Sequence, residues 1–109
     1  MVLYAAADLI WATRIKATAE SLGVPARPAR TIEMLEARFA DSPVRLVIVD
    51  LEAEGAMDLV RAASGRADVV AFGPHVAVEA LAAAKAEGAQ VMTRGGFDRA
   101  LADVLARAR

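Results

Sequence analysis

Only a few residues of this chain have the types and spacing that could support chemistry. The carboxylates of Asp8, Asp50 and Glu52 could together supply the oxygen ligands that a hard cation such as Mg²⁺ prefers. Asp8 and Asp50 also have structural interpretations, in which Asp8 is the N-cap of a helix and Asp50 accepts backbone N–H groups of the loop that follows it. His75 and Arg94 could contact a ligand or a partner near the same place.

Other catalytic arrangements lack the residues they need. The chain has no cysteine, which excludes disulfides, thiolate nucleophiles and cysteine metal sites. It has one histidine and no nucleophile elbow, so a Ser-His-Asp triad has no basis. Gly95 and Gly96 could offer backbone N–H groups to an anion beside Arg94, but they lack the spacing of a phosphate-binding loop and are interpreted as a turn. We therefore expect a protein that is not an enzyme.

The segment Gly73-Pro74-His75 has two interpretations. It can be a strand-to-helix turn, in which Pro74 fixes the first turn of a helix and His75 lies exposed near that helix N-terminus, where the dipole disfavours its protonation. Alternatively, Gly73 and His75 belong to a functional crevice, and His75 contacts a ligand or partner in a pH-sensitive way.

The elements that must position these residues follow from the apolar pattern. Short apolar runs alternate with segments of helical spacing, which is typical of a parallel sheet covered by helices. Asp8 and Thr31 are expected to cap the first two helices, and Gly55 to open the third. We expect strands at 2–7, 24–29, 44–50, 68–72 and 89–93, and helices at 8–22, 31–40, 55–65, 76–87 and 97–109.

The composition of the strands predicts their order. The segment 44–50 is apolar on both faces, which is typical of a central strand. Pro25 and Pro28 place the segment 24–29 at an edge, because proline cannot donate a ladder hydrogen bond. The pattern therefore predicts a single α/β domain over 1–109, doubly wound, with a five-stranded parallel sheet of order 2-1-3-4-5 in a three-layer sandwich. In such a sheet five residues would gather at the carboxyl ends of the strands: Ala7, Asp8, Asp50, Gly73 and Arg94.

Over nearly its whole length the chain resembles the receiver domains of response regulators. The resemblance is carried by the run Leu46–Asp50 that ends in aspartate, by the segment 82–89, and by Phe97 after the last strand. It implies the receiver-like, flavodoxin-like fold and a role in two-component signal transduction.

The resemblance also implies a set of functional positions, most of which this chain has lost. Receivers need a phospho-accepting aspartate, an acidic pair that holds Mg²⁺, a Ser or Thr, and a Lys. Asp50 matches the first, whereas the acidic pair falls on Ala6 and Ala7, the hydroxyl position on Gly73 and the lysine position on Gly95.

The implied protein is a stand-alone pseudo-receiver, a signalling or regulatory interaction module that phosphorylation does not switch and that needs no cofactor. The alternative is a phospho-accepting regulator that uses Asp50 with an atypical Mg²⁺ site including Asp8 and Glu52.

Charge and hydropathy limit the partners and the location. Thirteen basic and fourteen acidic residues leave a net charge of −1, so no basic surface is expected for nucleic acid. No segment has the length of a membrane helix and no secretory leader is evident, so we expect a cytoplasmic protein. Eleven arginines against two lysines fit a bacterial source.

We expect a protein partner such as a kinase or regulator. We also expect a weak homodimer through the segments 76–87, 89–93 and 97–109, with a polar rim of Lys85, Glu87, Arg99 and Asp103.

Overall fold

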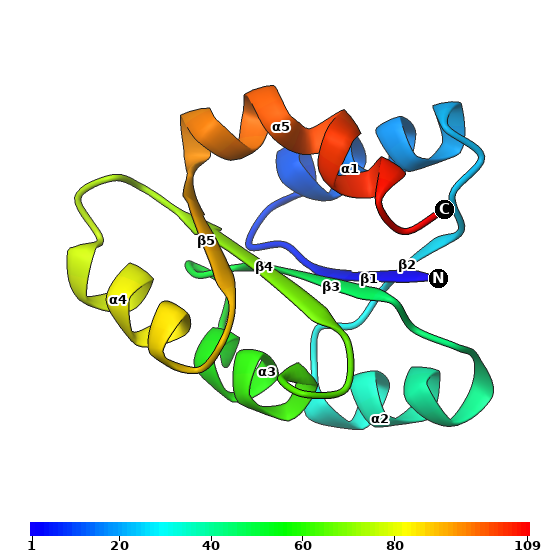
Figure 1. Cartoon of the computed structure of the whole chain (residues 1–109), viewed down its shortest axis with the longest axis horizontal. Helices are drawn as coiled ribbons and strands as arrows, with labels where there is room; N and C mark the ends of the chain where they lie inside the picture. The colour runs from blue at the N-terminus through cyan, green and yellow to red at the C-terminus, as the bar shows by residue number, and fades with distance from the viewer.

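Five strands alternate with five helices along the chain in the computed structural model, which describes residues 1–109 (Figure 1). The strands are β1 (Val2–Ala5), β2 (Ala26–Pro28), β3 (Leu46–Asp50), β4 (Asp68–Gly73) and β5 (Gln90–Thr93). The helices are α1 (Leu9–Ser21), α2 (Ile32–Asp41), α3 (Ala56–Ala63), α4 (Val78–Ala86) and α5 (Arg94–Ala106). No helix is long and apolar enough to cross a membrane.

All strands are parallel and form one sheet of order β2-β1-β3-β4-β5, as the sequence predicts. The proline-bearing strand β2 lies at one edge, where Tyr4 is the register partner of Pro28 and no further strand needs its missing N–H. Strand β3 lies at the centre, between β1 and β4. The predicted fold class is therefore confirmed.

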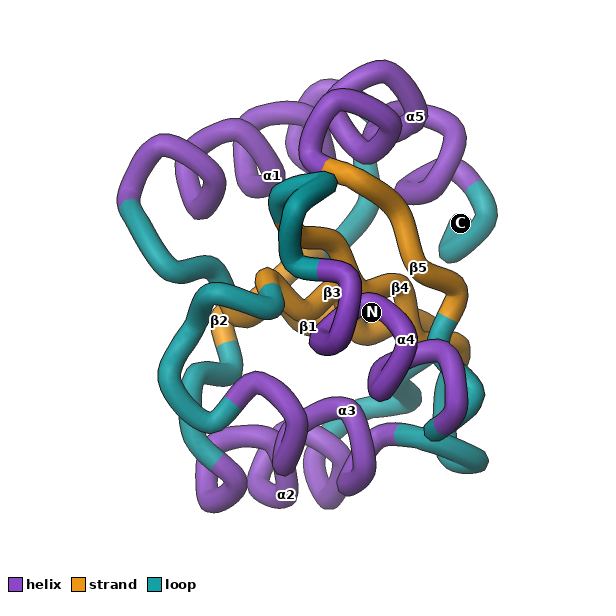
Figure 2. The backbone as a smooth tube through the Cα atoms, turned by 90° about the vertical axis from the view of Figure 1, so that its left-hand side faces the viewer, coloured by secondary structure: helices purple, strands orange, loops and turns teal.

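The sheet separates two hydrophobic cores, because successive side chains of a strand point to opposite faces. Leu46 and Ile48 of β3 pack with α1 and α5, whereas Val47 and Val49 pack on the other side with α2, α3 and α4. The two layers of helices are visible above and below the sheet in Figure 1 and, from the side, in Figure 2. The apolar character of β3 on both faces follows directly from this double coverage.

Aromatic side chains concentrate in the core on the α1/α5 face. The rings of Phe72 and Phe97 stack with their centroids 4.2 Å apart, and Trp11 lies against both at 4.9 and 5.5 Å. Phe72 belongs to β4 and the other two to α1 and α5, so the cluster joins three elements that are distant in sequence. Aromatic pairs in this range of separations stabilise a core beyond their buried area.

Three local predictions are wrong. Helix α4 begins at Val78 instead of residue 76, since Ala77 is its N-cap and residues 75–76 form a turn. Helix α5 begins at Arg94, so Gly95 and Gly96 lie inside its first turn and do not form a turn before it. Strand β1 ends at Ala5 instead of residue 7, so Ala6 and Ala7 lie in the loop that follows it.

We predict that Phe97→Ala lowers the free energy of unfolding by about 3–5 kcal/mol, because it leaves a cavity beneath Trp11 and Phe72 in a core that cannot close around it. Urea denaturation followed by Trp11 fluorescence measures the loss. Phe39→Ala is the control, since Phe39 is only half-buried on α2 and its truncation should cost clearly less. Equal losses for the two variants would contradict the central role of the aromatic cluster.

Candidate functional site

Asp50 ends β3 and is the only polar side chain in the buried set, at 0% exposure. Its two carboxylate oxygens accept different backbone amides: Oδ2 accepts the N–H of Ala7 at 3.0 Å and Oδ1 accepts the N–H of Glu52 at 3.0 Å. Its carbonyl oxygen accepts the N–H of Ala53 at 2.9 Å. Asp50 therefore joins the loop after β1 to the loop after β3, and its carboxylate has the structural role that the sequence offered as one interpretation.

The one acidic side chain of the loop after β1 is engaged in capping a helix. Asp8 is exposed, and its Oδ1 accepts the N–H of Trp11 at 2.9 Å, so it is the N-cap of α1 as expected. Ala6 and Ala7 occupy the residues between β1 and this cap. No three acidic or histidine side chains of the chain lie close enough together to hold a metal ion.

Glu52 and Arg94 are brought together by the fold. The Glu52 carboxylate forms an ion pair with Nη2 of Arg94, at the first residue of α5, and each side chain is about half exposed. This pair links the loop after β3 to the start of α5, across the end of the intervening strand β4. Sequence reasoning proposed both residues for the crevice but did not predict that they pair.

Gly73, the last residue of β4, is buried and faces Leu51. A Cβ built at position 73 would lie 3.5 Å from the Leu51 Cβ, in ordinary van der Waals contact. Position 73, where the resemblance implies a Ser or Thr, therefore lies against the aliphatic side chain of Leu51. His75 is exposed two residues beyond, in the turn that precedes α4, and takes part in no hydrogen bond or ion pair of the structure.

Thr93 starts α5 in place of the expected glycine turn. Its Oγ1 accepts the N–H of Gly96 at 3.1 Å, which caps the helix. A Cβ at position 96 would stand only 3.2 Å from that oxygen, so glycine allows the cap to close tightly. Gly95 lies in the same first turn and has no side chain that could reach Asp50.

A hollow that sequence reasoning missed lies beside these residues. It has a volume of about 560 Å³ and is formed by the loops that follow β1, β2 and β3. Its polar lining includes Arg30, Glu54 and Asp58. The rule that the carboxyl ends of parallel strands meet at one edge could have pointed to Arg30, because it directly follows the predicted strand 24–29.

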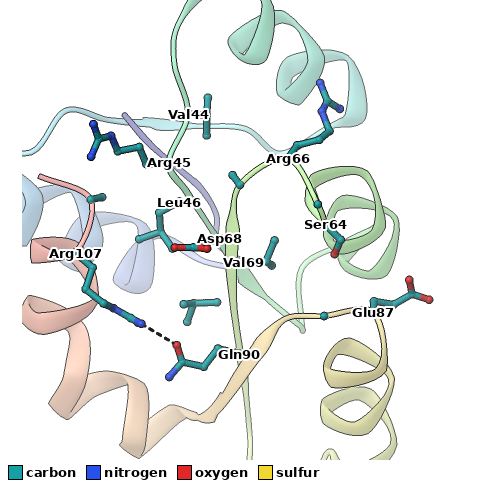
Figure 3. Close-up of a pocket in the computed structure, with 15 residues that line it drawn as sticks. Val44, Arg45, Leu46, Ser64, Arg66, Asp68, Val69, Glu87, Gln90 and Arg107 are labelled. Carbon is teal, nitrogen blue, oxygen red and sulfur yellow. Dashed lines mark hydrogen bonds between the residues drawn. The ribbon is translucent and has the colours of Figure 1, made fainter.

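A larger groove of about 850 Å³ lies at the opposite, amino-terminal ends of β3, β4 and β5 (Figure 3). Arginines dominate its charged lining, and Arg107 donates to the Gln90 side chain at 3.1 Å. Arg66 is held by Glu36, and this hydrogen bond lowers the pKa of the Glu36 carboxyl below its ordinary value. Of the residues singled out from the sequence, the groove contains Glu87, from the expected dimer rim, and none of the crevice residues.

Comparison with known proteins gives structural relatives only. No protein-family model matches the sequence, and no curated protein sequence matches it. The receiver domain of NtrX from Brucella abortus superposes with a TM-score of 0.82 at 20% identity, covering 99% of this chain and 97% of that domain. The beryllofluoride-activated NtrC4 receiver domain dimer gives 0.74 at 14% identity, covering 99% and 98%.

A longer NtrX chain from Brucella abortus gives a TM-score of 0.80 at 22% identity. That match covers 98% of the present chain and 26% of the NtrX chain, so the present chain spans about a quarter of its length. At these identities the likeness concerns the fold. With its strand order, its helix layers and these superpositions, the chain has the fold of a response-regulator receiver domain.

Proposed function

We propose that this chain is a receiver-like signalling module that acts by contact with a protein partner and is not switched by phosphorylation. The observation that carries the proposal is the state of Asp50. Both of its carboxylate oxygens already accept backbone amides, and the side chain is fully buried. A carboxylate in that state is held in place by the backbone and has no surface exposed to a phosphoryl donor, so the domain must open locally before Asp50 could attack one.

The surroundings of Asp50 support the same proposal. Phosphoryl transfer needs a cation to offset the charge that develops on the phosphoryl oxygens. The oxygens near Asp50 do not suit Mg²⁺, because Asp8 caps a helix and Glu52 pairs with Arg94. Gly73 and Gly95 have no side chains that could bind an added phosphoryl group and transmit its presence.

Protein contact is the natural means of action for a module of this kind. The carboxyl ends of the strands carry exposed aliphatic side chains, among them Leu9 and Ile10 at the start of α1 and Val76 and Val78 around the start of α4. Exposed aliphatic side chains grouped at one end of a domain are characteristic of interaction surfaces. No catalytic constellation accompanies them, so we do not propose an enzyme.

The direct test of the proposal is an NMR titration with beryllofluoride and Mg²⁺, which together mimic an acyl phosphate. We expect no saturable shift changes at the amides of Ala7, Leu51 and Glu52. We also expect no rise in thermal midpoint with Mg²⁺, since a cation that bound the native state would stabilise it. Saturable changes around Asp50 that vanish in Asp50→Asn would overturn the proposal in favour of a phospho-accepting regulator with an atypical metal site.

Asp50→Asn should destabilise the domain by about 1–3 kcal/mol. An amide side chain keeps one acceptor oxygen, but its NH₂ group would face the second backbone N–H and leave it unsatisfied. In a cluster of carboxylates the same change would relieve repulsion and be neutral or favourable. Urea denaturation measures the difference, with Asp8→Asn as control because asparagine caps a helix as well as aspartate does.

Partner binding by Asp50→Asn, compared at equal concentrations of folded protein, is expected to persist. A variant of unchanged stability that has lost all binding would contradict the structural role of Asp50.

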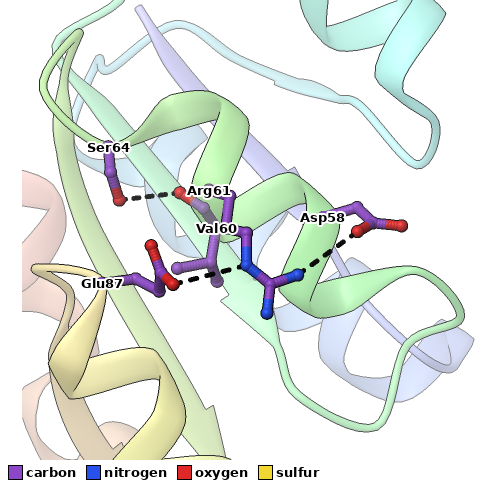
Figure 4. Close-up of polar contacts among 5 residues, drawn as sticks. All are labelled: Asp58, Val60, Arg61, Ser64 and Glu87. Carbon is purple, nitrogen blue, oxygen red and sulfur yellow. Dashed lines mark hydrogen bonds and ion pairs between the residues drawn. The ribbon is translucent and has the colours of Figure 1, made fainter.

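Self-association through the β5 edge is a further part of the proposal. The NtrC4 receiver domain is a dimer in its activated form. In the present chain the outer face of α4 carries exposed alanines, including Ala83, and β5 has no proline to blunt its edge. Of the expected rim residues, Glu87 already accepts a hydrogen bond from Arg61 of α3 at 3.3 Å (Figure 4), whereas Lys85, Arg99 and Asp103 form no ion pair within the chain.

We predict a weak homodimer that sedimentation equilibrium detects at concentrations on the order of several hundred micromolar. Ala83→Arg should abolish it, since a long charged side chain on α4 prevents close approach. Ala17→Arg on the exposed side of α1 is the matched control and should leave it unchanged. A strict monomer at these concentrations, or a dimer sensitive only to the α1 substitution, would show that β5 is not the interface.

A further inference from the structure

The hollow at the carboxyl ends of β1, β2 and β3 has an apolar lining. Half of its lining residues are hydrophobic: the four alanines Ala5, Ala6, Ala7 and Ala53, and the larger Ile32 and Leu59. Ile32 is 37% exposed there although it is a large aliphatic residue. The surface is accessible, since the hollow opens between three loops and has a volume of about 560 Å³.

Two carboxylates next to the apolar part of this lining are engaged elsewhere. Asp50 is fully buried and does not line the hollow, and its oxygens accept the amides of Ala7 and Glu52. The Glu52 carboxylate is drawn to Arg94 of α5. The apolar part of the lining is formed by alanine methyl groups together with Ile32, an environment that favours an aliphatic side chain over a hydrated cation.

The charged lining of the hollow is predominantly acidic. Three carboxylates, Glu52, Glu54 and Asp58, accompany one guanidinium, Arg30. Asp58 stands 3.5 Å from Arg61 in an exposed contact (Figure 4), which solvent screens strongly. Glu54 forms no ion pair, so its full charge faces solvent beside the apolar lining.

We propose that this hollow, which we call the alanine hollow, docks a segment of a partner protein that carries an aliphatic side chain flanked by lysine or arginine. The aliphatic side chain enters between Ala6, Ala7 and Ile32, and the flanking cation pairs with Glu54. The charge sets the orientation and the choice of partner, and the apolar burial supplies most of the binding. The inference rests on the proposed function as an interaction module and names the site and the chemistry of its partner.

The test uses three synthetic helical peptides of equal length and a ¹⁵N-labelled sample of the full chain. The first peptide carries leucines at helical spacing with lysines beside them. The second has glutamate in place of lysine, and the third has serine in place of leucine. We expect saturable shift changes with the first peptide alone, grouped at Ala6, Ala7, Ile32 and Gly55.

Several outcomes would overturn the inference. Binding of the glutamate peptide with equal affinity would remove the charge complementarity. Shift changes at Gly65 and Gly88 would move binding to the amino-terminal groove, and no saturable change at all would remove the site. Concentration-dependent shifts at the hollow without any peptide would identify its occupant as a second copy of this chain.

Matched variants distinguish peptide binding at the alanine hollow from non-specific peptide binding. Glu54→Lys and Ile32→Ser should each weaken binding of the leucine-lysine peptide about tenfold or more. Glu79→Lys at the start of α4 makes the same charge reversal at an exposed position outside the hollow, and should leave binding unchanged. An equal loss in Glu54→Lys and Glu79→Lys would contradict docking at this place. Thermal midpoints confirm that all three variants fold.

The two proposals fail in different ways. Failure of the peptide test with no beryllofluoride response removes the alanine hollow and leaves the interaction module standing. A beryllofluoride response at Asp50 removes the proposed function whichever peptide binds.

Discussion

The two hydrogen bonds accepted by the Asp50 carboxylate are the interaction on which the carboxyl end of this sheet depends. A buried carboxylate is unfavourable unless it is paired or hydrogen-bonded, and here two backbone amides supply the compensation. In return the aspartate fixes the loops after β1 and β3 relative to each other. The backbone positions of Ala7 and Glu52 follow from that constraint.

A second contact extends the constraint across the sheet. The Glu52–Arg94 ion pair links the loop after β3 to the start of α5, with Leu51 packed beside Gly73 between them. Being half exposed, the pair contributes modestly to stability, but it directs the Glu52 carboxylate toward α5. The Glu52 carboxylate is therefore separated from Asp50 in function, and no three acidic or histidine side chains gather there to hold a metal ion.

The fold itself does not need a chemically active site at this end. Its stability comes from the two cores on either side of β3 and from the Trp11, Phe72 and Phe97 cluster, which are built from apolar side chains of the strands and helices. A scaffold that is stable for these reasons keeps its shape when the residues on its loops change. This separation explains how a chain with so few of the residues expected from the resemblance retains a receiver fold that superposes with a TM-score of 0.82.

The sequence by itself determined the features that depend on local patterns. The apolar runs predict the strands, the prolines of β2 predict its place at the edge, and Asp8 and Thr31 predict two helix caps, because each depends on residues close in the chain. Local signals failed at the start of α5, where Thr93 caps the helix and the glycines that suggested a turn lie within it. Only the tertiary structure decided which side chains meet: the Glu52–Arg94 pair joins residues 42 positions apart, and the alanine hollow needs three separate loops. Such contacts depend on how far each strand extends and how each helix is tilted, and those distances are set by packing across the whole sheet.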